Sequence, residues 1–396
     1  MNNAASEFTS GWRIVAGSLL GISLGVSSLY FYSLGIFMKP MAAEFGWGRG
    51  AASLGAFVGT AGAALTAIPI GRLVDRVGSV RVAIGSLLVL ALCLVALGAL
   101  TSNLATFLAI TALLSLLSAG STPLPYTRLI VGAFRQHRGM ALGLTLAGTG
   151  VGALGIPVLL TPYVSHHGWR SGYFGLAAVI VILVPLTAWL ISSAKEGGVA
   201  RRPATSHLRL ARSESFRMLA LIFFLVSMAI LGGVVHFVPM LTDWGLSPEE
   251  AGGVAGLIGV TTIGGRLLTG ALLDRVPALA VTRAVFLIVA CGFVILVFGG
   301  HTFAVLGALV LGLAIGAEID LIAFLVGLYF PPTQYGQTYG AIYAVFLTGG
   351  AIGPALFGYL QEMTGDYRMS LLSGAGLLCV AAGLTLRLVR NAEQTA

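Results

Sequence analysis

The sequence predicts an all-α polytopic membrane protein, with twelve transmembrane helices arranged as two pseudo-symmetric bundles of six. Three observations support this prediction: a strongly apolar composition, twelve apolar stretches of helical length, and a repeat that relates the two halves. Of the 396 residues, 57% are hydrophobic and 9% are charged. In a soluble domain about a quarter of the residues are charged, so this chain has too few charged residues to cover a water-facing surface.

The apolar stretches are each long enough to cross a hydrocarbon core of about 30 Å as a helix. Their expected bounds are 12–38, 49–71, 80–101, 104–131, 139–163, 170–194, 217–241, 249–273, 281–299, 302–330, 336–361 and 369–390. A cleavable signal peptide is not expected, because the stretch opened by Arg13 is too long for the apolar region of such a signal.

One long polar segment, 195–216, interrupts the apolar stretches. It is basic and poor in aromatic residues, and it leaves six stretches on each side. We therefore expect an N-terminal bundle over 1–194, a cytoplasmic linker over 195–216 and a C-terminal bundle over 217–396. The alternative for this polybasic segment is a patch that binds anionic lipid.

The net charge of +8 is distributed as in a membrane protein. With the N-terminus inside, 16 of the 22 lysines and arginines fall on cytoplasmic segments and 4 on outer segments. This asymmetry is the positive-inside rule. It predicts that both termini are cytoplasmic and that the partner of the basic residues is the lipid bilayer, not nucleic acid. The other two cations, Arg128 and Arg266, fall within apolar stretches.

Short motifs recur between the two halves. Gly-Arg-Leu-Val-Asp-Arg at 71–76 recurs as Gly-Ala-Leu-Leu-Asp-Arg at 270–275, and Val-Gly-Ala-Phe at 131–134 recurs as Gly-Leu-Tyr-Phe at 327–330. Internal repeats with a midplane site between them are typical of secondary transporters. The repeat therefore favours a transporter whose substrate site lies between two related halves.

The sequence has no pattern that indicates catalysis or a bound cofactor. It lacks metal-ligand spacing, a nucleophile elbow and a phosphate-binding loop, and its three cysteines lie singly in apolar stretches. We expect no enzyme activity, no cofactor and no metal, with the cysteines packing as small side chains. Short loops also argue against a membrane receptor or scaffold.

The stretch GRLVDRVGSVR at 71–81 closely resembles the loop motif between the second and third helices of the major facilitator superfamily. The resemblance extends over the whole chain and implies that superfamily's fold, with a latch on the outward-open state. Glycine in the motif allows close helix approach, and the aspartate suits the positive end of a helix in the other half. The expected latch residues are Gly71, Asp75, Arg76, Gly270, Asp274 and Arg275.

Two further stretches resemble the monocarboxylate transporter family: GIFMKPM at 35–41 with EFGW at 44–47, and PYTRLIVGAFRQHRGMALG at 125–143. That family has an arginine four residues before a helix-end glycine, as Arg266 stands before Gly270. The resemblance implies a monomeric bacterial relative in the inner membrane that carries small carboxylates with protons. The family usually keeps an aspartate one turn before the arginine. Thr262 stands there, so a coupled proton must be carried elsewhere.

A charge at the bilayer centre costs about 2.5 to 3.5 kcal/mol, so such a group faces a cavity or a partner. Arginine offers a planar fork that fits a carboxylate, and we expect Arg266 to bind the substrate. The alternative is an ion pair that joins two helices. Further expected substrate contacts are Arg128, Tyr32, Tyr126, Tyr339 and His236. Each of these also fits packing or, for Arg128, a side chain that reaches the interface.

Two acids in one apolar stretch, Glu318 and Asp320, are the candidates for proton coupling. Two residues along a helix mean a rotation of about 200°, so at most one faces the cavity. The alternative is a carboxylate held in a pair with Arg266 or Arg128.

Two other functions also remain open: an anion exchanger that carries no proton, and a drug or metabolite exporter.

Overall fold

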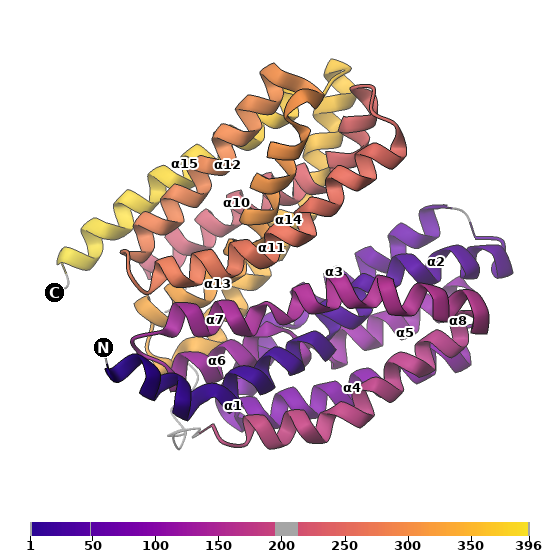
Figure 1. The fold of residues 1–396 in the computed structure, drawn as a ribbon, viewed down its shortest axis with the longest axis horizontal. Coiled ribbons are helices and arrows are strands. Elements are labelled where there is room, and N and C mark those ends of the chain that lie inside the picture. Colours follow the sequence, from indigo (N-terminus) through magenta and orange to yellow (C-terminus); the bar gives the residue numbers. More distant parts are fainter. Residues whose placement is uncertain (1, 48, 195–212, 395–396) are drawn as a thin grey trace. The chain divides into compact units, whose positions relative to one another are not determined.

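A computed structural model of the chain describes residues 2–47, 49–194 and 213–394 (Figure 1). Within these residues every regular element is a helix. The chain forms two units: Met1–Ala204 with Pro331–Gly340, and Thr205–Phe330 with Ala341–Ala396. Residues 195–212 of the predicted linker lie outside the described residues.

The first unit contains most of the N-terminal half. Its elements are α1 (Asn2–Leu24), the π-helical η1 (Val26–Tyr30), α2 (Phe31–Phe45), α3 (Arg49–Val77), α4 (Ser79–Leu100), α5 (Leu104–Leu117), η2 (Ala119–Ser121), α6 (Pro123–Ala133), α7 (Arg138–Leu146) and α8 (Gly148–Ile191). The long α8 is broken at Gly168, where φ is 82° and ψ is 162°. Only glycine adopts such a φ readily, and this break falls between the predicted stretches 139–163 and 170–194.

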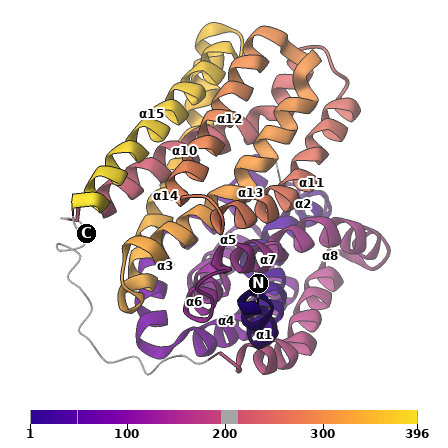
Figure 2. The ribbon, with the colours of Figure 1, turned by 60° about the vertical axis from the view of Figure 1, so that its left-hand side comes forward.

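The second unit is built from the C-terminal half. Its elements are α10 (Glu214–Asp243), α11 (Pro248–Leu273), α12 (Ala278–Gly299), η3 (Gly300–Phe303), α13 (Ala304–Tyr329), most of α14 (Tyr335–Thr364) and α15 (Arg368–Gln394). Inside this unit α11 packs along α13, and α12 packs along both α13 and α15 (Figure 2). The short η4 (Pro332–Gln334) and the start of α14 belong to the first unit.

Each predicted apolar stretch lies largely on helix, but the number of membrane crossings is only partly tested. By length and composition, eight of the described helices qualify as spans, or nine if the bent pair Glu7–Leu24 and Val26–Leu34 counts as one. Two predicted stretches merge into the single 52-residue segment Ala278–Tyr329, and 104–131 is divided by the turn at Ala119–Ser121. The count of twelve therefore remains a prediction.

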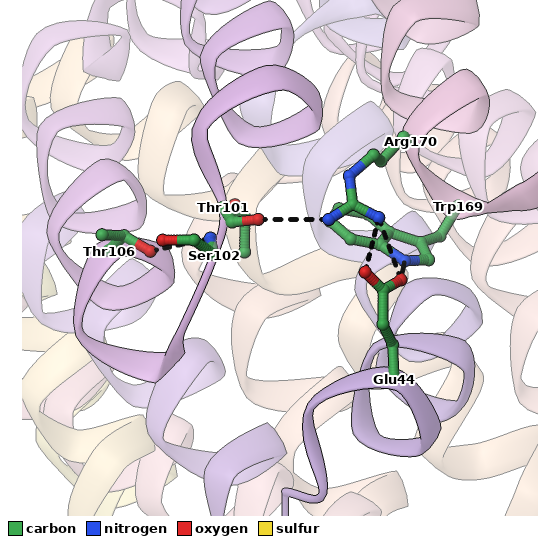
Figure 3. A network of polar contacts seen from close by, with 6 residues as sticks. All are labelled: Glu44, Thr101, Ser102, Thr106, Trp169 and Arg170. Carbon is green, nitrogen blue, oxygen red and sulfur yellow. Dashed lines mark hydrogen bonds and ion pairs between the residues drawn. The ribbon is translucent and has the colours of Figure 1, made fainter.

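A polar cluster ties three helix ends of the first unit together at the break in α8 (Figure 3). Glu44 accepts hydrogen bonds from Trp169 Nε1 at 2.6 Å and from Arg170 Nη1 at 2.7 Å. Arg170 also donates to the Thr101 carbonyl at 3.4 Å. The hydrogen bonds from Trp169 and then Arg170 lower the pKa of the Glu44 carboxyl below its usual value. The cluster therefore fixes the ends of α2 and α4 against the break in α8.

Candidate functional site

The candidate site in the second unit begins with a close crossing of α11 and α13. Gly312 and Gly316 lie one turn apart on one face of α13, the small-x-x-x-small spacing that brings membrane helices together. A Cβ on Gly316 would lie 2.4 Å from the carbonyl oxygen of Thr262, and one on Gly312 would lie 1.8 Å from Oγ1 of Thr261. Because no larger residue fits there, the glycines permit the approach that brings the next turn of α13 to α11.

On that next turn, Asp320 forms a buried ion pair with Arg266 of α11. Nη1 of Arg266 donates to Oδ1 of Asp320 at 2.7 Å, and the two side chains are 2% and 0% exposed. A buried charge is costly unless it is paired, and each group here compensates the other. The alternative left open by the sequence, a carboxylate held by Arg266, is therefore what the structure shows for Asp320.

The ion pair leaves hydrogen-bonding capacity unused. Among the described residues, Nε of Arg266, Oδ2 of Asp320 and Oε2 of Glu318 are buried without a hydrogen-bond partner. Glu318 is 3% exposed, and the charge that acts on it most directly is Arg266. Buried polar atoms normally have partners, so these three atoms mark a place where a ligand or a proton can bind.

Thr262 takes no part in this pairing. Its hydroxyl donates to the carbonyl of Ile258, one turn earlier in its own helix, at 2.7 Å. The acid that faces Arg266 therefore comes from α13, 54 residues further along the chain.

Gly316→Ala should destabilise the second unit by about 1–3 kcal/mol, because the added methyl group would push α13 away from α11. The control is Gly264→Ala in α11, where a Cβ meets no atom within 4 Å. Alanine is the better helix former by about 1 kcal/mol, so this control should be neutral or stabilising. Thermal unfolding of the purified proteins checks the pair, and equal melting temperatures would contradict the prediction.

In the first unit, Asp75 of α3 binds the start of α14. Its Oδ1 accepts from the backbone N–H of Gly336 at 3.1 Å, and its Oδ2 accepts from that of Gln337 at 2.8 Å. A carboxylate suits the partial positive charge of a helix N-terminus. Gly71 makes the approach possible, because a Cβ there would lie 2.1 Å from the Gly336 carbonyl oxygen. These contacts have the form that a latch requires, and its effect on transport remains a prediction.

Arg128 belongs to the Asp75 cluster. Its Nη1 lies 3.5 Å from Oδ1 of Asp75 and donates to the carbonyl of Val74. The same side chain lines a cavity of about 550 Å³ within the first unit, together with Ser79 and Tyr335. Arg128 is therefore paired with Asp75, and its predicted contact with substrate stays a prediction.

The remaining latch candidates lie near the ends of their helices. Arg76 and Arg275 are exposed, Gly270 is buried, and Asp274 is the C-cap residue that follows α11. These positions place a pair of related motifs at the ends of α3 and α11. The mirror latch formed by Gly270, Asp274 and Arg275 also remains a prediction.

The three candidate tyrosines lie in the first unit, whereas Arg266 lies in the second. Tyr126 is fully buried, and a Cβ on Gly21 would lie 2.4 Å from its ring. Tyr339 is buried with its ring 5.8 Å from that of Tyr335, and Tyr32 is half-buried. Tyr126 and Tyr339 thus occupy packed positions, and a contact of the three tyrosines with substrate remains a prediction.

His236 lies in the second unit with both ring nitrogens engaged. Nε2 lies 2.9 Å from the carbonyl oxygen of Pro354, and Nδ1 lies 3.2 Å from the hydroxyl of Tyr367. Because a carbonyl only accepts, Nε2 carries the proton in this arrangement. Through these contacts His236 joins α10 to α14. This packing role is the alternative to substrate binding that the sequence left open.

Known proteins resemble this chain in sequence and in fold. A family model described as Major Facilitator Superfamily matches residues 20–354. Monocarboxylate transporter 13 of Bos taurus is 28% identical over 306 residues, which cover 74% of this chain and 71% of the relative. A gallate transporter of Pseudomonas putida is 26% identical over 360 residues, which cover 77% and 78%. The crystal structure of the transporter FucP in the outward conformation covers 94% of this chain and 98% of FucP, with a TM-score of 0.78 at 17% identity.

Proposed function

The chain belongs to the major facilitator superfamily, as its sequence predicted, and we propose that it carries small monocarboxylates together with protons by alternating access. It is a multi-pass membrane protein with the all-α fold of that superfamily. The proposal includes a monomer in a bacterial inner membrane, with both termini in the cytoplasm. Its two bundles would rock around a midplane site, as the internal repeat suggests.

The observation that carries the proposal is the buried Arg266, whose Nε has no hydrogen-bond partner among the described residues. An arginine binds a carboxylate through two parallel N–H bonds, and here only Nη1 is occupied, by Asp320. The guanidinium therefore keeps donors with which a substrate carboxylate can form this two-bond contact when Asp320 gives way. The names of the relatives agree with this chemistry, since a monocarboxylate transporter and a gallate transporter both refer to carboxylates.

The test is uptake of radiolabelled carboxylates by proteoliposomes under an inward proton gradient. Arg266→Lys keeps the charge that Asp320 needs but loses the planar fork. We expect this variant to remain folded and its uptake to fall by about a hundredfold. Thermal shift against a panel of carboxylates should identify a ligand that stabilises the wild type and not the variant. Undiminished uptake by Arg266→Lys would refute the assignment of Arg266.

An anion exchanger is the second candidate, and a specific observation favours it. Thr262 stands one turn before Arg266 and donates to the Ile258 carbonyl of its own helix, so no proton-carrying acid is present at that position. Counterflow of carboxylate that ignores an imposed proton gradient would establish exchange. Uptake that follows the gradient would establish symport.

A further inference from the structure

We infer that Asp320 is the group that takes up the transported proton, because the substrate carboxylate replaces it on Arg266, and that Glu318 keeps its own proton throughout the cycle. The inference rests on the proposed function and assigns separate roles to the two acids of α13. It also explains how a chain with Thr262 one turn before Arg266 can still couple transport to protons.

Geometry separates the two acids. Asp320 touches the guanidinium at 2.7 Å and shares its burial, whereas no hydrogen bond or ion pair is found for Glu318 among the described residues. The acid that the substrate displaces from Arg266 must be bound to Arg266 before the substrate arrives. Only Asp320 meets this condition.

Counting charges leads to the same assignment. The buried cluster has one guanidinium and two carboxyl groups, so only one carboxyl can be ionised without leaving an uncompensated buried charge. In the empty site the ionised group is Asp320, since it forms the ion pair. When a substrate carboxylate occupies Arg266, the substrate supplies the single negative charge, and both acids must then be neutral.

The proton balance follows directly. A proton from the solution joins an oxygen of Asp320 as its ion pair with Arg266 breaks, and the substrate carboxylate forms the new pair. One anion and one proton enter together, and the net charge of the site does not change. Release on the other side reverses both steps, so each carboxylate travels with one proton.

The surroundings contain few groups that could take over this role. In the described part of the second unit, Arg266 of α11 is the charge that acts on both acids of α13, and Tyr343 of α14 is close enough to be influenced by Arg266 and Glu318. A tyrosine ordinarily loses its proton only near pH 10. Glu318 and Asp320 are thus the two groups that the experiment must separate.

The first experiment compares two isosteric variants in proteoliposomes. Asp320→Asn should retain carboxylate counterflow but lose accumulation driven by a proton gradient, because asparagine cannot cycle a proton. Glu318→Gln mimics a carboxyl that stays protonated, so accumulation by this variant should still follow the proton gradient, whatever its rate. The reverse pattern, with coupling lost in Glu318→Gln and kept in Asp320→Asn, would overturn the inference. Loss of counterflow in folded Asp320→Asn would also overturn it.

The second experiment moves the acid. Position 262 lies one turn before Arg266, the spacing at which an acid and an arginine meet on one helix. Thr262→Asp combined with Asp320→Asn should therefore restore proton-driven accumulation, whereas Thr261→Asp combined with Asp320→Asn should not. Rescue at both positions or at neither would contradict a requirement for an acid facing Arg266.

A binding measurement keeps the inference testable without transport. If one proton binds with each anion, the Kd for carboxylate should rise about tenfold per pH unit above neutral in the wild type and in Glu318→Gln. In Asp320→Asn the Kd should not change with pH. A pH dependence lost in Glu318→Gln instead would assign the proton to Glu318. Absence of any carboxylate binding by the wild type would refute the proposed function itself, a result distinct from these.

Discussion

Arg266→Ala should destabilise the second unit by about 3–5 kcal/mol and abolish carboxylate uptake, because it leaves the Asp320 charge buried without its partner. The carboxylate is fully buried, and its hydrogen bond to the guanidinium is the contact that compensates its charge. Differential scanning fluorimetry of the purified protein measures the loss of stability, and uptake by proteoliposomes measures the loss of function.

Two controls separate the effect of breaking the Arg266–Asp320 ion pair from the effect of removing a large side chain. Arg266→Met combined with Asp320→Leu removes both charges, so stability should largely return while uptake stays absent. Arg283→Ala removes another arginine of the same unit. Arg283 donates to the Thr385 hydroxyl at 3.1 Å, and among the described residues it forms no ion pair with an acid. Its cost should be about 1 kcal/mol. If Arg266→Ala costs no more than Arg283→Ala, the ion pair does not stabilise the unit.

The sequence was sufficient to identify Arg266 as exceptional, because a charge in an apolar stretch of α11 requires a partner or a cavity. The sequence also singled out Gly71 and Asp75, because their spacing matches a known motif. In the structure both residues contact the start of α14. The sequence could single out these residues because each signal depends on the local character of a short segment, whereas their roles in transport remain predictions. The predicted boundary between residues 163 and 170 is also local, and α8 breaks within it at Gly168, a residue that the sequence alone did not single out.

Which acid meets Arg266 could not be read from the sequence. Helical rotation shows only that Glu318 and Asp320 face different ways. The pairing depends on how far α13 slides along α11, and that register is set where Gly316 meets the backbone of Thr262. The spacing of Gly312 and Gly316 was a signal for close packing, but it does not specify which helix is approached.

The cluster at the break in α8 was missed for a similar reason. Glu44 lies 125 residues before Trp169 and 126 before Arg170, in segments that the sequence presents as ordinary helix ends. A hydrogen bond between Glu44 and Trp169 requires the fold that brings α2 beside α8. No local pattern predicts it.

Asp75→Ala should expose the start of α14 to hydrogen exchange, with protection of the Gly336 and Gln337 amides reduced at least about tenfold. Both amides now donate to the Asp75 carboxylate, at 3.1 Å and 2.8 Å. Hydrogen bonds to a charged acceptor stabilise by about 1.5–3 kcal/mol each. In the variant a water molecule would replace the carboxylate as the acceptor, and because water is uncharged its hydrogen bonds to the two amides would be weaker. Hydrogen–deuterium exchange with mass spectrometry of peptides that contain 331–340 measures the effect.

Asp75→Asn provides a graded comparison, because an amide oxygen can still accept one of the two hydrogen bonds while the pairing with Arg128 is lost. Its effect on exchange should lie between those of the wild type and Asp75→Ala. Arg76→Gln is the matched control: the side chain is exposed beside Asp75, and its exchange pattern should match the wild type. Unchanged protection in Asp75→Ala would show that the carboxylate does not hold this segment.

The latch and the substrate site can be separated by their effects on binding and transport. Asp75 lies in the first unit and Arg266 in the second, with no residue shared between the two clusters. Asp75→Ala should therefore slow uptake while carboxylate affinity stays within about threefold of the wild type. Arg266→Lys should weaken affinity and uptake together. If Asp75→Ala weakened binding as strongly as Arg266→Lys, the Asp75 cluster would have to be counted as part of the substrate site, and its role as a separate latch would be wrong.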